Sequence, residues 1–126
     1  MSHFTTIETR IHDLDALRAA CAEMGVETAE NAVARGFGSQ RRVGRLVIRL
    51  KGPYDVAVNP AKDGTGYMLE TDLWQGRVEQ ELGPGLGRLR QLYAVHKATA
   101  EARKRGHRVR RSVLPDGRIR LRVTGA

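Results

Sequence analysis

Residues 46–74 have the sequence LVIRLKGPYDVAVNPAKDGTGYMLETDLW, and this stretch decides the fold. It holds three short segments rich in β-branched, aliphatic and aromatic residues, at 46–50, 55–59 and 67–74. This composition is typical of β-strands. Glycine- and proline-containing stretches separate the segments and favour turns. Three strands joined by short turns predict an antiparallel meander at the centre of the fold.

One helix is predicted on each side of this meander. Before it, apolar residues recur at spacings of three and four over 14–24, with Asp13 as the N-cap and Gly25 just past the last turn. After it, a longer helix is predicted over about 86–105, ending at Gly106. Its expected apolar face consists of Leu86, Leu89, Tyr93, His96 and Ala100.

The N-terminal part is predicted to add one or two strands. Residues 4–10 alternate and favour a short strand, and a second short strand is an option at 26–28. Residues 31–44 are rich in Gly, Ala and Arg and have no sustained period. We expect a loop or loose hairpin there, with its arginines exposed.

The C-terminus predicts a β-hairpin. Two alternating segments, at 108–113 and 118–123, flank Pro115-Asp116-Gly117, a combination that favours a tight turn. The complete order is then β-α-(β)-β-β-β-α-β-β. This order predicts an α+β fold in which an antiparallel sheet of about five to six strands carries two helices on one face.

Length and composition are consistent with one domain over 1–126. The chain has 126 residues, of which 40% are hydrophobic, enough for one ordinary core. No apolar stretch approaches the length of a membrane span, and the N-terminus lacks the pattern of a signal peptide. The single cysteine, Cys21, excludes an internal disulfide. We therefore expect a cytoplasmic protein that does not contact a membrane.

Charge is distributed unevenly along the chain. The formal net charge is +8, from 22 basic and 14 acidic residues, and most of the bases are arginine. Residues 1–34 and 52–87 are acidic, whereas 35–51 carry six bases and no acid, and 88–126 carry twelve bases and two acids. Arginine favours bidentate contacts with carboxylate or phosphate. The two basic segments are therefore candidate binding regions for an anionic partner.

The strongest candidate is a row of arginines on the predicted hairpin. Alternation would turn Ile119, Leu121 and Val123 inward and the intervening arginines outward. The predicted anion- or partner-binding residues are Arg103, Lys104, Arg105, Arg108, Arg110, Arg118, Arg120 and Arg122. A secondary basic patch is predicted at Arg41, Arg42 and Arg45. A charged, solvated strand that discourages edge-to-edge aggregation is the alternative interpretation.

Two kinds of partner fit such a row, an acidic protein surface and a nucleic-acid backbone. The hairpin contains no aromatic residue on which a base could stack. Binding to RNA or DNA would therefore be through the phosphate backbone, with weak sequence preference and a steep dependence on salt. The residues of the hairpin leave both alternatives open.

Catalytic and metal-binding patterns are not evident. The four histidines and Cys21 lack the spacing of metal ligands, and the Gly-rich stretch at 83–87 lacks the lysine of a phosphate-binding loop. His96 beside Tyr93 is the best candidate for an enzymatic centre, but a partly buried, hydrogen-bonded structural histidine is the favoured interpretation. We predict no enzyme, no catalytic residue, no metal and no cofactor.

Three segments together carry a family resemblance. They are Met1-Ser2-His3-Phe4-Thr5-Thr6-Ile7, Leu92-Tyr93-Ala94-Val95-His96-Lys97 and Asp116-Gly117-Arg118-Ile119-Arg120-Leu121. In this order and spacing they resemble a small family of unknown function, found as conserved open reading frames in cyanobacteria, algal plastids and other bacteria. The resemblance implies an accessory or adaptor protein whose partners are an AAA-type ATPase and a small companion protein. It supplies no catalytic residues.

Overall fold

The computed structural model of this protein describes residues 3–125, apart from the side chain of Glu8. Its strands are β1 (Thr5–Ile11), β2 (Glu27–Arg35), β3 (Arg41–Arg49), β4 (Val56–Pro60), β5 (Tyr67–Thr71), β6 (Arg108–Val113) and β7 (Ile119–Thr124). Its helices are α1 (Leu14–Glu23), α2 (Arg77–Leu82) and α3 (Gly87–Lys104), with 3-10 turns η1 (Trp74–Gly76) and η2 (Pro84–Leu86). The predicted α+β class is confirmed. Met1 and Ser2, which open one segment of the family resemblance, lie outside the described residues.

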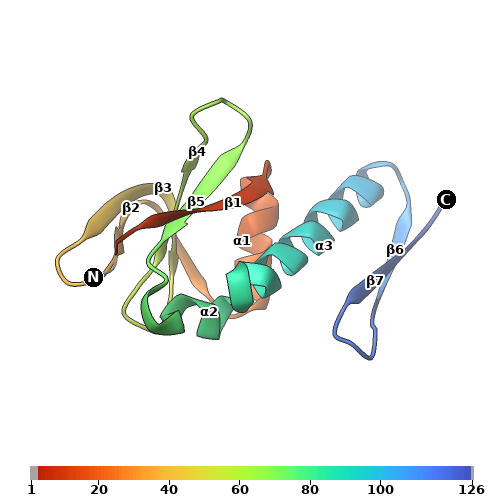
Figure 1. Ribbon diagram of the computed structural model, residues 1–126. Helices are drawn as coiled ribbons and strands as arrows, with labels where there is room; N and C mark the ends of the chain where they lie inside the picture. Colours follow the sequence, from red (N-terminus) through yellow and green to blue (C-terminus); the bar gives the residue numbers. More distant parts are fainter. Residues whose placement is uncertain (1–2, 126) are drawn as a thin grey trace.

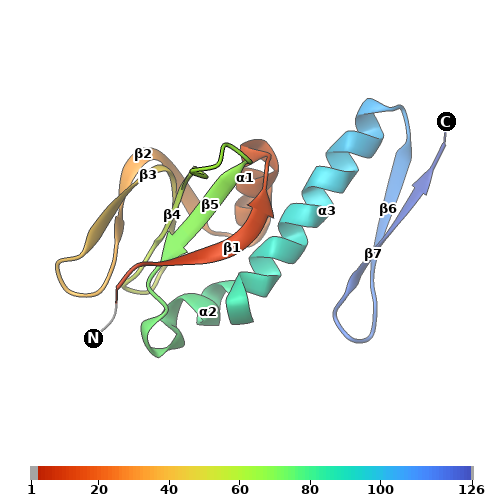
Figure 2. The same ribbon diagram turned by 45° about the horizontal axis from the view of Figure 1, so that its top comes forward.

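The strands form two separate antiparallel sheets. The larger has the order β1-β5-β4-β3-β2, and its centre is the predicted meander of β3, β4 and β5. The smaller is the C-terminal hairpin of β6 and β7. In both views of the ribbon, α3 lies between the larger sheet and this hairpin (Figures 1 and 2). The hairpin is therefore supported by a helix and not by the strands of the larger sheet.

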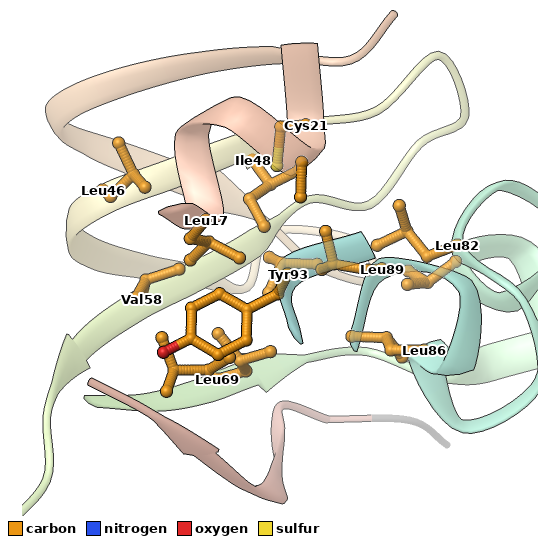
Figure 3. Close-up of a cluster of buried hydrophobic side chains, with 14 of the residues drawn as sticks. Leu17, Cys21, Leu46, Ile48, Val58, Leu69, Leu82, Leu86, Leu89 and Tyr93 are labelled. Carbon is orange, nitrogen blue, oxygen red and sulfur yellow. The ribbon is translucent and has the colours of Figure 1, made fainter. Parts of the chain in front are cut away.

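The main core lies between the larger sheet and the helices on one of its faces. Fully buried side chains from α1, β3, β4, β5 and α3 meet there, as Figure 3 shows for Leu17, Ile48 and Leu69. Asp13 caps α1 as predicted, because its Oδ1 accepts hydrogen bonds from the backbone N–H groups of Asp15 and Ala16. Helix α2, which was not predicted, contributes Val78 and Leu82 to the same core.

The segment 31–44, predicted as a loop or loose hairpin, forms most of a long, regular, curved hairpin of β2 and β3, visible at the left of Figure 1. Arg35, expected to be exposed, is partly buried. Its end folds back onto the other face of the sheet. There a small second cluster of Phe4, Ala34, Val47 and Ala57 is buried. A Cβ atom on Gly36 would lie 2.6 Å from Cε2 of Phe4, so the close packing requires glycine.

Candidate partner-binding surface

The C-terminal hairpin has the predicted turn. Gly117 has a φ of 88°, which favours glycine, and its N–H donates a 2.9 Å hydrogen bond to the carbonyl of Leu114. The N–H of Leu114 donates to the carbonyl of Arg118 at 2.8 Å. Asp116 accepts a hydrogen bond from the backbone N–H of Arg118. These bonds set the register of the two strands.

The register divides the hairpin residues into an inner and an outer face. On the inner face, Val109 pairs with Val123, Arg111 with Leu121, and Val113 with Ile119. Val109, Ile119 and Leu121 are partly buried. On the outer face, Arg108 pairs with Thr124, Arg110 with Arg122, and Ser112 with Arg120. All four outer arginines are exposed, as the alternation predicted. We call Arg108, Arg110, Arg120 and Arg122 the arginine face.

The arginine face carries positive charge that the rest of the described chain leaves uncompensated. Arg110 and Arg122 stand directly opposite one another, and like charges in this position are destabilising. Among residues 3–125, none of the four guanidinium groups has an ion pair. An external anion would relieve this repulsion.

Arg118 differs from the other arginines of the predicted row. Its Nε lies 2.7 Å from Oδ2 of Asp116 within the turn. The charge of this arginine is therefore partly compensated by its neighbour. The predicted row of three on β7 is reduced to Arg120 and Arg122, and β6 supplies the other two members of the arginine face.

Helix α3 holds the hairpin through three kinds of contact. At the turn, Nε2 of Gln91 donates to the carbonyl of Gly117 at 3.2 Å. Further along, NH1 of Arg111 donates to Oε2 of Glu23 at 2.8 Å, and the other oxygen of Glu23 lies 2.7 Å from Nε2 of His96. Val95 and Ala102, on the same side of α3 as Gln91, are buried outside the two core clusters. The helix therefore has two buried sides, one for each sheet.

The basic end of α3 adjoins the arginine face. Arg103 and Lys104 lie in the last helical turn, Arg105 caps it, and all three are exposed. Only Gly106 and His107 separate this end from β6. The structure thus brings the predicted helix-end bases next to the base of the hairpin (Figure 2).

The predicted secondary basic patch, Arg41, Arg42 and Arg45, is not part of this surface. These residues lie on β3, which Figure 1 shows on the far side of the molecule from the hairpin. NH1 of Arg41 donates to the carbonyls of Gly38 and Gln40. Arg42 stacks over the ring of Phe4, with 5.4 Å between its Cζ and the ring centroid, and pairs with Glu70 at 3.5 Å. Only Arg45 is exposed without such a contact among the described residues.

The residues considered for catalysis have structural contacts. The hydroxyl oxygen of Tyr93 accepts hydrogen bonds from the backbone N–H groups of His12 at 2.8 Å and Asp13 at 3.2 Å. The hydrogen bond from Arg111 and that from His96 hold the pKa of Glu23 below its usual value. Burial raises the pKa of the Cys21 thiol to about 12, which leaves it protonated.

A cluster of two arginines around a buried carboxylate is a feature that sequence reasoning missed. Asp55 is fully buried and directly precedes β4. Its carboxylate accepts hydrogen bonds from Nε and NH2 of Arg35, at 2.9 and 2.8 Å, and from NH1 of Arg49 at 3.2 Å. Burial opposes its ionisation, but the hydrogen bonds from Arg35 and from the backbone of Leu50 keep its pKa below the ordinary value. This carboxylate holds the end of β2 against β4.

A pair of exposed aromatic rings is a second feature that the sequence did not predict. Phe37 and Trp74 meet edge to face, with ring centroids 6.1 Å apart. Below them, Asp72 is fully buried and accepts hydrogen bonds from the backbone N–H groups of both residues. The pair lies at the end of the β2–β3 hairpin, away from the arginine face.

The described residues contain no group of three or more His, Cys, Asp or Glu side chains placed to hold a metal ion. Within the same residues, no helix has the length and apolar character needed to cross a membrane.

Comparison with known proteins identifies the family. The model of a family described as "protein of unknown function (DUF1257)" matches residues 20–122, from α1 to the C-terminal hairpin. The uncharacterized protein ycf35 of Guillardia theta is 30% identical over 125 residues, which cover 96% of this chain and 94% of that protein. No solved structure matches. The resemblance found in the sequence is confirmed, and the chain belongs to the DUF1257 family.

Proposed function

We propose that this protein is a non-enzymatic accessory protein that binds an acidic surface on a protein partner through the arginine face and the adjoining end of α3. The observation that carries the proposal is the exposure of four guanidinium groups with no intramolecular ion pair among the described residues. Two of them, Arg110 and Arg122, stand opposite one another, which is unfavourable in the free protein. Acidic side chains of a partner would remove this repulsion.

A protein partner fits the hairpin better than a nucleic acid because apolar side chains are exposed beside the arginines. Val113 is 70% exposed and Val123 is 48% exposed, both on the inner face. Protein interfaces combine such apolar contacts with arginine. The hairpin offers no aromatic ring for a base to stack on. The family resemblance makes an AAA-type ATPase complex, with a small companion protein, the first partner to test.

The test is affinity purification of the tagged protein from its native cells, with and without nuclease. A variant in which Arg108, Arg110, Arg120 and Arg122 are replaced by serine removes the arginine face. The matched control replaces Arg41 and Arg45 by serine, which removes charge elsewhere. We expect a stoichiometric protein that survives nuclease, is captured by the control and is lost from the four-site variant. Capture that is equal for all three proteins would contradict the proposal.

Binding to an RNA or DNA backbone is the alternative, and the excess of ten positive charges over residues 88–126 favours it. It requires that the captured material disappear after nuclease treatment. It also requires an affinity for a duplex oligonucleotide that falls steeply between about 50 and 200 mM salt, since counterions are released on binding. Weak salt dependence would exclude this alternative.

A further inference from the structure

The C-terminal hairpin is an incomplete sheet. It has two strands, and none of the five strands of the larger sheet pairs with it. A two-stranded ribbon is marginal in water unless a further strand or a helix supports it. Here α3 covers the inner face only in part, because Val113 and Val123 remain largely exposed on it. Among the described residues, the outer edges of β6 and β7 have no neighbouring strand.

The hydrogen-bond alternation identifies the backbone groups that an added strand would meet. The bond from the N–H of Leu114 to the carbonyl of Arg118 makes these two residues a hydrogen-bonded pair. Hydrogen-bonded and non-hydrogen-bonded pairs alternate along an antiparallel ladder. The N–H and C=O groups of Ile119, Leu121 and Val123 thus point away from β6, toward the free edge of β7.

The two strands of the hairpin differ in their side-chain ties to the rest of the molecule. Arg111 ties β6 to α1 through its ion pair with Glu23. In the described part of the chain, no side chain of Ile119–Thr124 forms a hydrogen bond or an ion pair. A strand added at β7 would displace no such contact.

We propose that the partner adds an extended strand antiparallel to β7 at its free edge, and that this strand alternates acidic and apolar residues. The inference rests on the proposed function and specifies the chemistry of the partner. Strand addition at an exposed edge combines main-chain hydrogen bonds with alternate side-chain contacts. On the outer face, the added residues would lie beside Arg120 and Arg122, so acidic side chains fit. On the inner face, they would lie beside Leu121 and Val123, so apolar side chains fit.

A second copy of this chain is a poorer occupant of the same edge. Pairing β7 with β7 of another copy would place Arg120 and Arg122 beside the same residues of that copy. Like charges side by side on one face of a sheet are destabilising. Charge complementarity therefore favours an acidic strand over self-association.

The test uses a capped octapeptide of alternating glutamate and valine and measures its affinity for the full chain by fluorescence anisotropy. The first control has the same composition with four glutamates followed by four valines. Two further peptides carry N-methyl groups on the valines or on the glutamates. In the proposed pairing the valine N–H groups face β7, so methylation of the valines weakens binding about tenfold or more, as expected for lost main-chain hydrogen bonds. Methylation of the glutamates leaves the affinity nearly unchanged, and the block peptide binds weakly.

Two matched variants of the protein locate the edge. Val123→Pro removes an outward N–H from β7, and Val109→Pro removes one from the residue opposite it on β6. We expect Val123→Pro to abolish peptide binding and Val109→Pro to leave it intact, with circular dichroism confirming that both fold. In the unaltered protein, the amides of Ile119, Leu121 and Val123 become protected from hydrogen exchange when the alternating peptide binds.

Each other outcome overturns a stated part of the proposal. One outcome is that the four-site variant, in which the arginine face is replaced by serine, loses the peptide while Val123→Pro and valine methylation have no effect. The proposed function then stands and strand addition is wrong. If Val123→Pro loses the peptide while the four-site variant keeps it, the acidic chemistry is wrong. If Val109→Pro alone loses the peptide, the edge is β6.

If no peptide binds, strand addition is wrong, and capture of the native partner still decides the proposed function. Dimers detected by light scattering that dissociate in Val123→Pro would identify a second copy as the occupant.

Discussion

Buried carboxylates are paired with arginines in the five-stranded body, at Asp55 and Glu70, whereas the arginine face of the C-terminal hairpin has no ion pair among the described residues. In the body, the buried carboxylate of Asp55 is surrounded by Arg35, Arg49 and backbone donors, and Glu70 is paired with Arg42. In the hairpin, Arg110 and Arg122 face solvent and each other. The arginines of the body neutralise these two carboxylates, whereas those of the arginine face are expected to make the fold slightly less stable. This difference is the physical reason for the proposal that the hairpin binds a partner.

The two regions also differ in how deeply their apolar residues are buried. Leu46 in β3 is fully buried, whereas Leu121 in β7 is only partly buried. The expected order of mutational effects follows from both differences.

The largest effect is expected from truncating the body core. Leu46→Ala should lower the free energy of unfolding by about 3 kcal/mol, because it removes buried methyl groups and leaves a cavity. The same change in the hairpin, Leu121→Ala, should lower it by about 1 kcal/mol, because less area leaves water on folding. Urea denaturation followed by circular dichroism measures both. Equal losses would show that the hairpin is packed as tightly as the body.

Loss of the buried carboxylate is expected to be the next largest effect. Asp55→Asn should lower the free energy of unfolding by about 2 kcal/mol at neutral pH, since the hydrogen bonds from Arg35 and Arg49 lose their charged acceptor. Asp63→Asn is the control, because Asp63 is exposed and its partner Thr65 is a near neighbour.

The same carboxylate predicts a dependence on pH. The pKa of Asp55 in the folded protein is below its ordinary value of 3.8. A group with a lowered folded-state pKa contributes stability that is present above its unfolded pKa and is lost as the pH falls through the folded pKa. The difference in unfolding free energy between the wild type and Asp55→Asn should therefore be constant above about pH 5 and shrink below about pH 4. A difference that grows on acidification would contradict the assignment.

A smaller effect is expected where the body contacts α3. Tyr93→Phe should lower the free energy of unfolding by about 1 kcal/mol, because the N–H groups of His12 and Asp13 lose their acceptor. Tyr67→Phe is the control, since the hydroxyl of Tyr67 has no hydrogen bond within residues 3–125. Thermal unfolding of the two variants side by side gives the comparison.

The contact between the two regions should be weaker still. A double-mutant cycle on Glu23→Gln and Arg111→Gln should give a coupling of about 0.5 kcal/mol, as for other exposed ion pairs, and it should decrease with salt. The hydrogen bond from Arg111 lowers the pKa of Glu23 below 4.5. The coupling should therefore be present at neutral pH and be lost as the pH falls below that value. A coupling that persists in acid would point to packing of the side chains instead.

The smallest effect is expected from the arginine face. Arg110→Ser with Arg122→Ser should leave the free energy of unfolding unchanged or raise it by a few tenths of a kcal/mol, since it removes a repulsion. Arg35→Ser is the contrasting control. It removes the side-chain hydrogen bonds that Arg35 donates to the buried Asp55, so it should be clearly destabilising. A marked loss of stability in the hairpin variant would mean that these arginines support the fold, and the contrast between the two regions would fail.

Much of the fold follows from local patterns, and what was missed depends on distant contacts. The alternation in β7 and the apolar segments of the meander predict their strands directly. Residues 31–44 of the β2–β3 hairpin were predicted only as a loop or loose hairpin, because they alternate poorly. Arg35 and Asp55, twenty residues apart, hold the end of this hairpin in place. Helix α2 is only six residues long, too short for a helical period to be evident.

In α3 and in the candidate surface, too, local patterns predict some features and distant contacts determine the others. The predicted apolar face includes Leu89 and Tyr93, which are buried, but also Ala100, which is exposed. The second buried side, with Val95 and Ala102, exists only because the hairpin folds back along the helix. For the arginines, period-two alternation predicts which side chains point outward. It does not predict that Arg111 pairs with a glutamate 88 residues earlier.

The hydroxyl of Tyr93 ties the first helix to residues made much later. Its oxygen accepts hydrogen bonds from the backbone N–H groups of His12 and Asp13, up to 81 positions earlier in the chain. During synthesis, the hydrogen bonds at the N-terminal end of α1 can form only after α3 has left the ribosome. Such long-range closure slows folding. A nascent chain halted before Tyr93 would expose the apolar side of α1 and become a client for chaperones.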